Sequence, residues 1–221
     1  MRVLVIGASR GLGQEFVRQY LADHAQVTAT ARRAEDVADL EAMGATAFAL
    51  DVTDAASASA LAWRVDNAGF DIAIVNAGIY GPRHTGLDTP TEDEFDAVMH
   101  TNVLGAMRVI PQLVEALAPN ARLAVLSSRM ASMGLRAEPR GWLYRASKAA
   151  LNSVLKDVSL VLGDRATCVA FHPGWVQTDM GGAEADLTPP RSVADMRATL
   201  AALKPAQTGS FLNHDGQPLA W

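Results

Sequence analysis

VLVIGASRGLG, residues 3–13, is the stretch of sequence that decides the fold. Residues 3–6 form a continuous apolar run, which is typical of a strand buried on both faces of a parallel sheet. Three glycines follow at once, Gly7, Gly11 and Gly13, and a helical pattern begins at the third. Glycine lets the backbone turn sharply and approach a pyrophosphate, whose charge the free N–H groups of a helix N-terminus can meet. The order of strand, loop and helix therefore favours a dinucleotide site over a structural turn.

Short β-rich runs alternate with longer helical stretches along the rest of the chain. Further strands are expected at residues 26–30, 47–50, 72–75, 122–126, 167–171 and 209–212. Helices are expected at residues 13–24, 34–43, 55–65, 91–117 and 146–162. This alternation predicts an α/β fold in which residues 1–221 form one domain, a doubly wound parallel sheet of the Rossmann type. Residues 178–191 are rich in Gly, Asp and Pro and are expected to form a mobile loop.

Composition excludes several classes of function. The chain has 221 residues and a net charge of -5, which argues against a nucleic-acid partner. It has no apolar run of about 18 residues, so no membrane span is expected, and MRVLVIG is too short for a signal peptide. The lone Cys168 cannot form an internal disulfide, which favours the cytoplasm and a packing role for this thiol. The histidines lack metal-ligand spacing, so no metal is expected.

The glycine spacing GxxxGxG and a series of later motifs resemble the short-chain dehydrogenase/reductase family. The motifs follow in the family's order: Asp51-Val52, Asn76-Ala77-Gly78, Asn102, Ser127-Ser128, Tyr144-x-x-x-Lys148 and Pro173-Gly174. The stretch at residues 172–178 and the ending Asp215-Gly216…Trp221 are similar to the C-factor and sniffer-like carbonyl reductase branch. The resemblance covers nearly the whole chain, and it implies an enzyme that reduces a ketone or an aldehyde to an alcohol, reversibly.

The resemblance also implies a row of cofactor contacts along the sheet. The expected cofactor-binding residues are Gly7, Ser9, Arg10, Gly11, Leu12, Gly13, Arg32, Asp51, Val52, Asn76, Ala77, Gly78, Tyr144, Lys148, Pro173, Gly174, Val176 and Thr178. Among them, Asp51 is expected to hydrogen-bond the adenine ring and Thr178 the nicotinamide carboxamide. Ordinary turn chemistry after a strand is the alternative for Asp51 and for Asn76.

Charge favours NADP(H) over NAD(H). An NAD site usually places an acidic residue at the end of the second strand, where it accepts a hydrogen bond from the ribose 2′-OH. Here Arg32 and Arg33 stand at that point, with no carboxylate before Glu35. Guanidinium groups bind a 2′-phosphate through charge-assisted hydrogen bonds, and Arg10 in the glycine loop can reach the same phosphate. The alternative is that Arg32 and Arg33 are solvated charges at a strand end.

Tyr144 and Lys148 are the expected centre of the chemistry. They are four residues apart at the start of a helical run, so they lie on one helix face. The phenol of a tyrosine ordinarily has a pKa of about 10, and a nearby ammonium lowers it, so that the phenol can act as acid or base near its working pH. The resemblance implies that Tyr144 is the general acid/base, and that Lys148 tunes it and holds the nicotinamide ribose.

Two further polar residues complete the expected catalytic set. Ser128 ends the fifth expected strand, and a serine there can polarise the substrate carbonyl. Ser127 and Ser132 are rivals, because the gap to Tyr144 is longer than in many relatives. Asn102 matches the family asparagine that supports a proton relay through water to the lysine, and its alternative role is to cap or kink the long helix.

The remaining expectations concern the substrate and partners. Trp175, Met180 and the loop up to Arg191 are expected to cover a small-molecule carbonyl or alcohol substrate, with Arg83 and His84 on the opposite wall. Relatives pair through the two long helices, so a homodimer or homotetramer is expected. A regulatory or signalling protein that binds NADP(H) with incidental turnover is the alternative function. The intact Ser128, Tyr144 and Lys148 set favours the enzyme.

Overall fold

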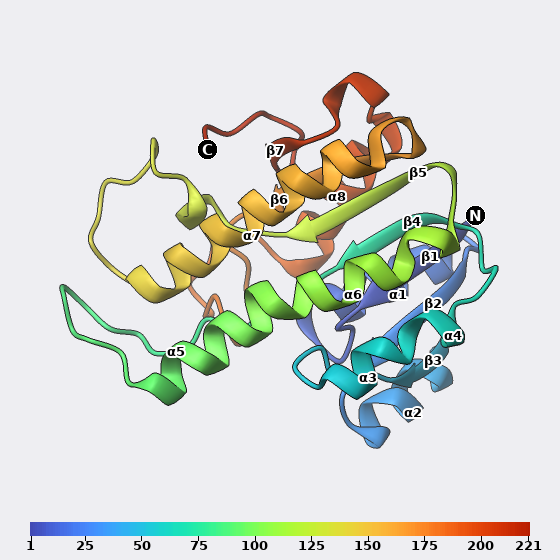
Figure 1. The fold of residues 1–221 in the computed structure, drawn as a ribbon, viewed down its shortest axis with the longest axis horizontal. Coiled ribbons are helices and arrows are strands. Elements are labelled where there is room, and N and C mark those ends of the chain that lie inside the picture. The colour runs from blue at the N-terminus through green and yellow to red at the C-terminus, as the bar shows by residue number, and fades with distance from the viewer.

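The alternating strands and helices fold into one seven-stranded parallel sheet between two layers of helices, in a computed structural model that describes residues 1–221 (Figure 1). The strands are β1 (Arg2–Ile6), β2 (Gln26–Ala31), β3 (Thr46–Ala49), β4 (Phe70–Val75), β5 (Leu117–Leu126), β6 (Ala166–His172) and β7 (Ser210–Asn213). Their order in the sheet is β3-β2-β1-β4-β5-β6-β7, and every neighbouring pair is parallel. The predicted doubly wound sheet is confirmed.

The helices flank this sheet on both faces. They are α1 (Gly11–Ala22), α2 (Ala34–Ala42), α3 (Ala55–Ser59), α4 (Leu61–Arg64), α5 (Glu92–Met99), α6 (Gly105–Leu113), α7 (Trp142–Leu162) and α8 (Pro189–Ala202). Figure 1 shows the segments after β4 and β5 extending beyond the sheet on the left, beside the start of α7. No helix is long and apolar enough to cross a bilayer.

Two apolar clusters form the core, one on each face of the sheet. In β1, Leu4 and Ile6 belong to the cluster shared with α3, α4, α6 and α7, whereas Val3 and Val5 belong to the cluster shared with α1, α2 and α8. Successive side chains of a strand point to opposite faces, so an uninterrupted apolar run is what a strand covered on both sides requires.

The helix expected at residues 91–117 is interrupted. A π-helical turn at His100–Leu104 separates α5 from α6, and β5 already begins at Leu117. The side chain of Asn102, inside this turn, donates to the carbonyl of Ile79 and accepts from its N–H, both at 2.8 Å. A π-helical turn of this kind often marks a functional site, and here it directs Asn102 towards the segment after β4.

Three other boundaries differ from the sequence expectation. Helix α7 begins at Trp142 rather than residue 146, and the helix expected at residues 55–65 is divided into α3 and α4. Residues 178–191 were expected to be a mobile loop, but α8 begins within them at Pro189. Two prolines at a helix start suit the first turn, which has no N–H bonds to lose, and the buried Val193, Met196 and Leu200 then dock α8 on the sheet.

A pair of leucines on α7 tests this account of the core. Leu155 is 0% exposed and lies in the first cluster, whereas Leu160 on the same helix is 69% exposed. We expect Leu155→Ala to lower the free energy of unfolding by about 2–5 kcal/mol, because it removes packed methyl groups and leaves a cavity. Leu160→Ala is the control, with an expected change within about 0.5 kcal/mol. Urea denaturation of both variants measures the difference, and equal losses would contradict the assigned packing.

Candidate active site

The reversal of strand order beside β1 places the candidate site at the carboxyl edge of the sheet. In open α/β sheets, ligands bind outside the carboxyl ends of the strands at such a switch point. Strand β1 has β2 on one side and β4 on the other. The glycine loop leaves β1 at this edge, and the segment that starts at Asn76 leaves β4 beside it.

The glycine loop is packed so tightly that side chains would not fit. Gly7 has a φ of +84°, and a Cβ there would lie 2.8 Å from the backbone of Ala77. A Cβ on Gly13 would lie 2.3 Å from the Gly7 carbonyl oxygen, which accepts a 2.6 Å hydrogen bond from Asn76 Nδ2. Helix α1 already begins at Gly11, within the loop, and has no side-chain cap. Its first N–H groups are therefore available to an anionic group.

Around this loop, Ser9 and Leu12 are half-buried, and Leu12 packs on the second core cluster. Val52 is buried against α6, where a Cβ on Gly105 would lie 2.8 Å from its Cγ2. Gly78 continues the chain past the catalytic candidates: a Cβ there would lie 3.2 Å from both Asn102 Oδ1 and Lys148 Nζ. The structure thus brings the segment after β4 against both the glycine loop and Lys148.

The three arginines expected near a 2′-phosphate have different partners. Arg33 is held by Glu35 and by Asp36, each at 2.9 Å. Arg10 forms an ion pair with Asp179 at 2.6 Å. Arg32 is exposed and has no ion-pair partner. Of the three, Arg32 has its guanidinium fully available.

The carboxylate of Asp51 has one oxygen that accepts hydrogen bonds within the protein and one that does not. Its Oδ1 accepts from the N–H and the hydroxyl of Thr53, at 2.8 and 2.7 Å, and its Oδ2 has no protein donor. Burial acts to raise the pKa of Asp51, but the Thr53 hydrogen bonds and the charges of Arg32 and Arg108 outweigh it and hold the pKa below its ordinary value. The carboxylate is therefore ionised at neutral pH with one oxygen free for a ligand donor.

The segment after β6 folds back onto the glycine loop. The Pro173 carbonyl accepts a 2.6 Å hydrogen bond from Ser192 of α8, and Gly174 has a φ of +85°. Val176 is buried and forms a bridge with Leu187. Thr178 then lies next to Gly11, where a Cβ would be 3.4 Å from Thr178 Cγ2. The expected nicotinamide segment and the expected phosphate loop are thus neighbours.

Tyr144 and Lys148 lie in the first two turns of α7, both nearly fully buried. Lys148 Nζ donates to the Leu126 carbonyl at 2.7 Å and lies 5.8 Å from the centre of the Tyr144 ring. Burial lowers the pKa of Lys148 to about 8. Burial raises the pKa of Tyr144 to about 12, although the Ser128 hydroxyl lowers it. The expected lowering of the Tyr144 pKa by Lys148 is not found in this structure: burial has the largest effect, and Ser128 is the group that lowers the pKa.

The three candidate serines point in different directions. Ser128 lies two residues after the end of β5, beside Tyr144, and its Oγ accepts from the Met130 N–H at 3.1 Å. Ser127 Oγ instead faces the Lys148 carbonyl at 3.5 Å. Ser132 is fully buried and bonds Leu135 N and the Trp221 carbonyl. Only Ser128 of the three is placed next to the phenol.

Asn102 links the interruption of the long helix to α7. It lies in the π-helical turn that interrupts the long helix, and its Nδ2 also donates to Ser147 Oγ at 2.9 Å. Ser147 precedes Lys148 on α7. Asn102 thereby ties the segment after β4 to the turn of α7 that carries the lysine.

Residues from two segments cover Tyr144. Met180 Sδ lies 3.9 Å from Tyr144 Oη, and the Met180 carbonyl accepts a 2.8 Å hydrogen bond from Arg83. The Tyr80 ring stacks on Tyr144 with centroids 4.5 Å apart, and Arg83 lies 4.9 Å from the Tyr80 centroid. Sequence reasoning overlooked Tyr80, whose only signal is its position two residues after Gly78.

Four other residues have contacts or pKa shifts that do not involve the phenol. His84 faces Glu94 at 3.6 Å, and Trp175 donates to the Gly181 carbonyl at 2.8 Å. Burial lowers the pKa of His172 to about 4, so this histidine is neutral, as a structural residue would be. Cys168 is buried in β6, and burial raises the pKa of its thiol to about 11. A thiol so rarely ionised is a packing residue.

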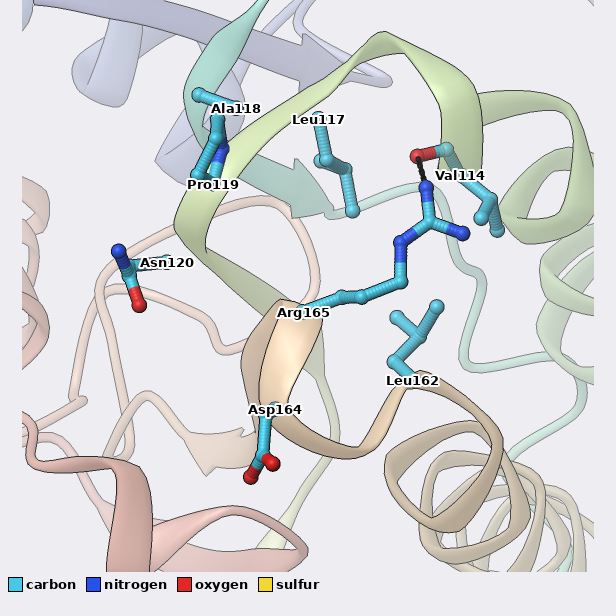
Figure 2. Close-up of a pocket in the computed structure, with 8 residues that line it drawn as sticks. All are labelled: Val114, Leu117, Ala118, Pro119, Asn120, Leu162, Asp164 and Arg165. Carbon is cyan, nitrogen blue, oxygen red and sulfur yellow. Dashed lines mark hydrogen bonds between the residues drawn. The ribbon is translucent and has the colours of Figure 1, made fainter.

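A cavity of about 240 Å³ lies at the opposite edge of the sheet (Figure 2). It is lined by Val114, Leu117, Ala118, Pro119, Asn120, Leu162, Asp164 and Arg165. These residues belong to the start of β5, the end of α7 and the short turns that adjoin them. The cavity is therefore remote from the carboxyl ends of the strands and is not part of the candidate site.

Comparison with known proteins places this arrangement in a family. A profile described as short chain dehydrogenase matches residues 1–187. The C-signal protein of Myxococcus xanthus is 34% identical over 165 residues, which cover 73% of this chain and 99% of that protein.

Two solved structures superpose on the whole chain. The carbonyl reductase Sniffer of D. melanogaster is 28% identical, with a TM-score of 0.89 and coverage of 100% of this chain and 99% of that one. A carbonyl reductase from Pseudomonas aeruginosa PAO1, in complex with NADP, is 32% identical, with a TM-score of 0.85 and the same coverage.

Burial of Lys148 predicts a pH-dependent cost to stability. Its pKa of about 8 in the fold lies below its usual 10.5, so the unfolded chain binds more protons between these values, and unfolding free energy rises with pH across that window. We expect Lys148→Met to be more stable than the parent protein at pH 7, by up to about 3 kcal/mol, with a gain that shrinks towards pH 10. Denaturant unfolding of both proteins from pH 7 to 10 measures this difference.

The matched control is Lys156→Met, which changes an exposed lysine of the same helix. It should show no comparable trend with pH. The same trend in both variants would show that the buried ammonium is not its source.

Proposed function

The chain belongs to the short-chain dehydrogenase family, and from this premise we propose that it is an NADPH-dependent oxidoreductase that reduces a ketone or an aldehyde to an alcohol, and can run in reverse. The observation that carries the proposal is the meeting of Ser128, Tyr144 and Lys148 at the carboxyl edge of the sheet, beside the glycine loop. A protein that only sensed the nucleotide would not need this buried polar set, so the regulatory alternative is not favoured.

The glycine loop and the residues around it fit a dinucleotide. The proposed contacts are the uncapped start of α1 for the pyrophosphate, the free Oδ2 of Asp51 for the adenine, and Thr178 for the carboxamide. Arg32, with Arg10, would hold the 2′-phosphate. The NADP complex of the similar P. aeruginosa reductase supports this choice of cofactor. When bound, the nicotinamide supplies the hydride.

Tyr144 is proposed to supply the proton. A pKa of about 12 keeps the phenol protonated at neutral pH, and an alkoxide is a stronger base than a phenolate, so the proton moves to the substrate oxygen as charge develops there. The Ser128 hydroxyl would donate a hydrogen bond to that same oxygen. Met180, Arg83 and Tyr80 would exclude water around it.

Lys148 is proposed to stabilise the phenolate that remains. With a pKa of about 8, its ammonium is mostly protonated at neutral pH, and its position by the Tyr144 ring places positive charge near the phenolate. The Leu126 carbonyl fixes the ammonium. Asn102 is proposed to position this turn of α7 through Ser147 and to support proton return to the lysine through water.

Self-association is a further part of the proposal. Residues 1–221 are proposed to act as one domain that forms a homodimer or homotetramer through the long helices. Exposed apolar side chains lie on those helices, namely Phe95, Met107 and Val161. Such side chains can be buried against a second copy of the chain.

Tyr144→Phe tests the assigned chemistry. We expect it to lower turnover of a carbonyl panel by about 10²–10⁴-fold, because general acid catalysis is lost, while NADPH binding stays within about threefold. NADPH oxidation gives the turnover and a fluorescence titration gives the binding. Tyr80→Phe is the control, since it keeps the ring stacked on Tyr144 and removes only a hydroxyl, and it should retain most of the turnover. Unchanged turnover in Tyr144→Phe would refute the assignment, and NADPH binding with no turnover in either protein would favour sensing.

Arg32→Ala tests the choice of cofactor. We expect it to weaken NADPH binding by about 10- to 100-fold and NADH binding little, because a charge-assisted hydrogen bond contributes about 1.5–3 kcal/mol. Arg33→Ala is the control, since Glu35 and Asp36 already hold that guanidinium. Titrations of both nucleotides provide the measurement. Equal losses of NADPH affinity in the two variants would contradict the special role of Arg32.

A further inference from the structure

Arg10, one of the two arginines proposed to hold the 2′-phosphate, already forms an ion pair with an acidic side chain of the protein. Asp179 Oδ2 lies 2.6 Å from Arg10 Nη1, although the two residues are 169 positions apart in the chain. Their side chains are 74% and 75% exposed. An ion pair this open to water is weak and easily exchanged for another partner.

Both Arg10 and Arg32 act electrostatically on Asp36 near the start of α2. The pKa of Asp36 is lowered mainly by its hydrogen bond from Arg33, and also by the charges of Arg10 and Arg32. The carboxylates of Glu35, Asp36 and Asp179 offset the three arginines in this region. Glu35 and Asp36 engage Arg33, so Asp179 is the acid that a phosphate would meet at Arg10.

Asp179 also belongs to the segment that covers the phenol. The next residue, Met180, places its sulfur 3.9 Å from Tyr144 Oη, and its carbonyl is bonded to Arg83. One residue further on, the Gly181 carbonyl accepts from Trp175 Nε1. The Arg10–Asp179 pair therefore anchors residues 178–182 at the nucleotide end, as Arg83 anchors them at the substrate end.

We propose that Asp179 competes with the 2′-phosphate of the cofactor for Arg10, so that a 2′-phosphorylated nucleotide frees residues 178–182 from this anchor, whereas a nucleotide without that phosphate leaves it in place. This inference rests on the proposed NADP(H) function. A phosphate monoester carries about two negative charges at neutral pH and three acceptor oxygens, so it displaces a single carboxylate from an exposed guanidinium. Asp179 nevertheless weakens binding, because its charge repels the phosphate.

Calorimetric titration with two probes isolates the 2′-phosphate. Adenosine 2′,5′-bisphosphate and 5′-AMP differ only in that group, and neither carries the nicotinamide that would contact Thr178. We expect Asp179→Asn to bind the bisphosphate about three- to tenfold more tightly than the parent protein, with 5′-AMP unchanged within about twofold. Glu184→Gln removes the same charge from an exposed acid that lies two residues beyond this segment and has no ion pair, and it should alter neither affinity beyond about twofold.

A second background shows whether the effect passes through Arg10. In Arg10→Gln, adding Asp179→Asn should change bisphosphate affinity by less than about twofold, because the contested guanidinium is gone. A gain equal to that in the parent background overturns the proposal. A gain for 5′-AMP as large as for the bisphosphate overturns it too.

Tryptophan emission reports on the covering segment. The bisphosphate should shift the emission of the parent protein and 5′-AMP should not, and Trp175→Phe should abolish the shift, since Trp175 is bonded to Gly181. An unchanged emission overturns release of the segment.

If the parent protein binds both probes equally, the NADP(H) proposal fails together with this inference. If it prefers the bisphosphate while Asp179→Asn matches Glu184→Gln, only this inference fails.

Discussion

The close packing of two chain reversals, after β1 and after β4, is the constraint on which the rest of the site depends. A Cβ at Gly7 would lie 2.8 Å from the Ala77 backbone, so this contact is possible only between a glycine and a bare main chain. Because β1 and β4 are neighbours in the sheet, the contact falls at the carboxyl edge. The chain then continues through Gly78, which passes within reach of Lys148. One packing contact thus aligns the proposed nucleotide half of the site with its proposed catalytic half.

The catalytic half is built from polar groups that are expensive to bury. Tyr144, Lys148 and Asn102 are each less than a tenth exposed, and desolvation alone moves the pKa values of the first two in opposite directions. Backbone carbonyls at Leu126 and Ile79 hold the ammonium and the amide in place, which offsets part of the desolvation cost. The result is a fixed acid and a fixed cation in a region with little water, where small charge changes on a substrate have large effects.

In the proposed nucleotide half, by contrast, the charged side chains are exposed and form ion pairs with one another. Arg10, Arg33 and their carboxylate partners are screened by water and exchange partners at low cost. Residues 178–182 link the two halves, because they contact both the exposed Arg10 and the buried Tyr144. The residues proposed to recognise the nucleotide and the cover over the phenol therefore share one short segment.

The sequence by itself determined the order of strands and helices, the glycine loop and the Tyr144–Lys148 spacing, because apolar periodicity and short motifs are local properties of a chain. The sequence did not reveal contacts between distant residues. The pattern of residues 91–117 is helical throughout, whereas the π-helical turn depends on a hydrogen bond between Asn102 and Ile79, which are 23 residues apart. Only the tertiary structure decided which serine lies beside the phenol, that burial raises the Tyr144 pKa, and that Arg10 has an acidic partner. Desolvation and ion pairing depend on which surfaces meet in three dimensions, and spacing along the chain does not encode that.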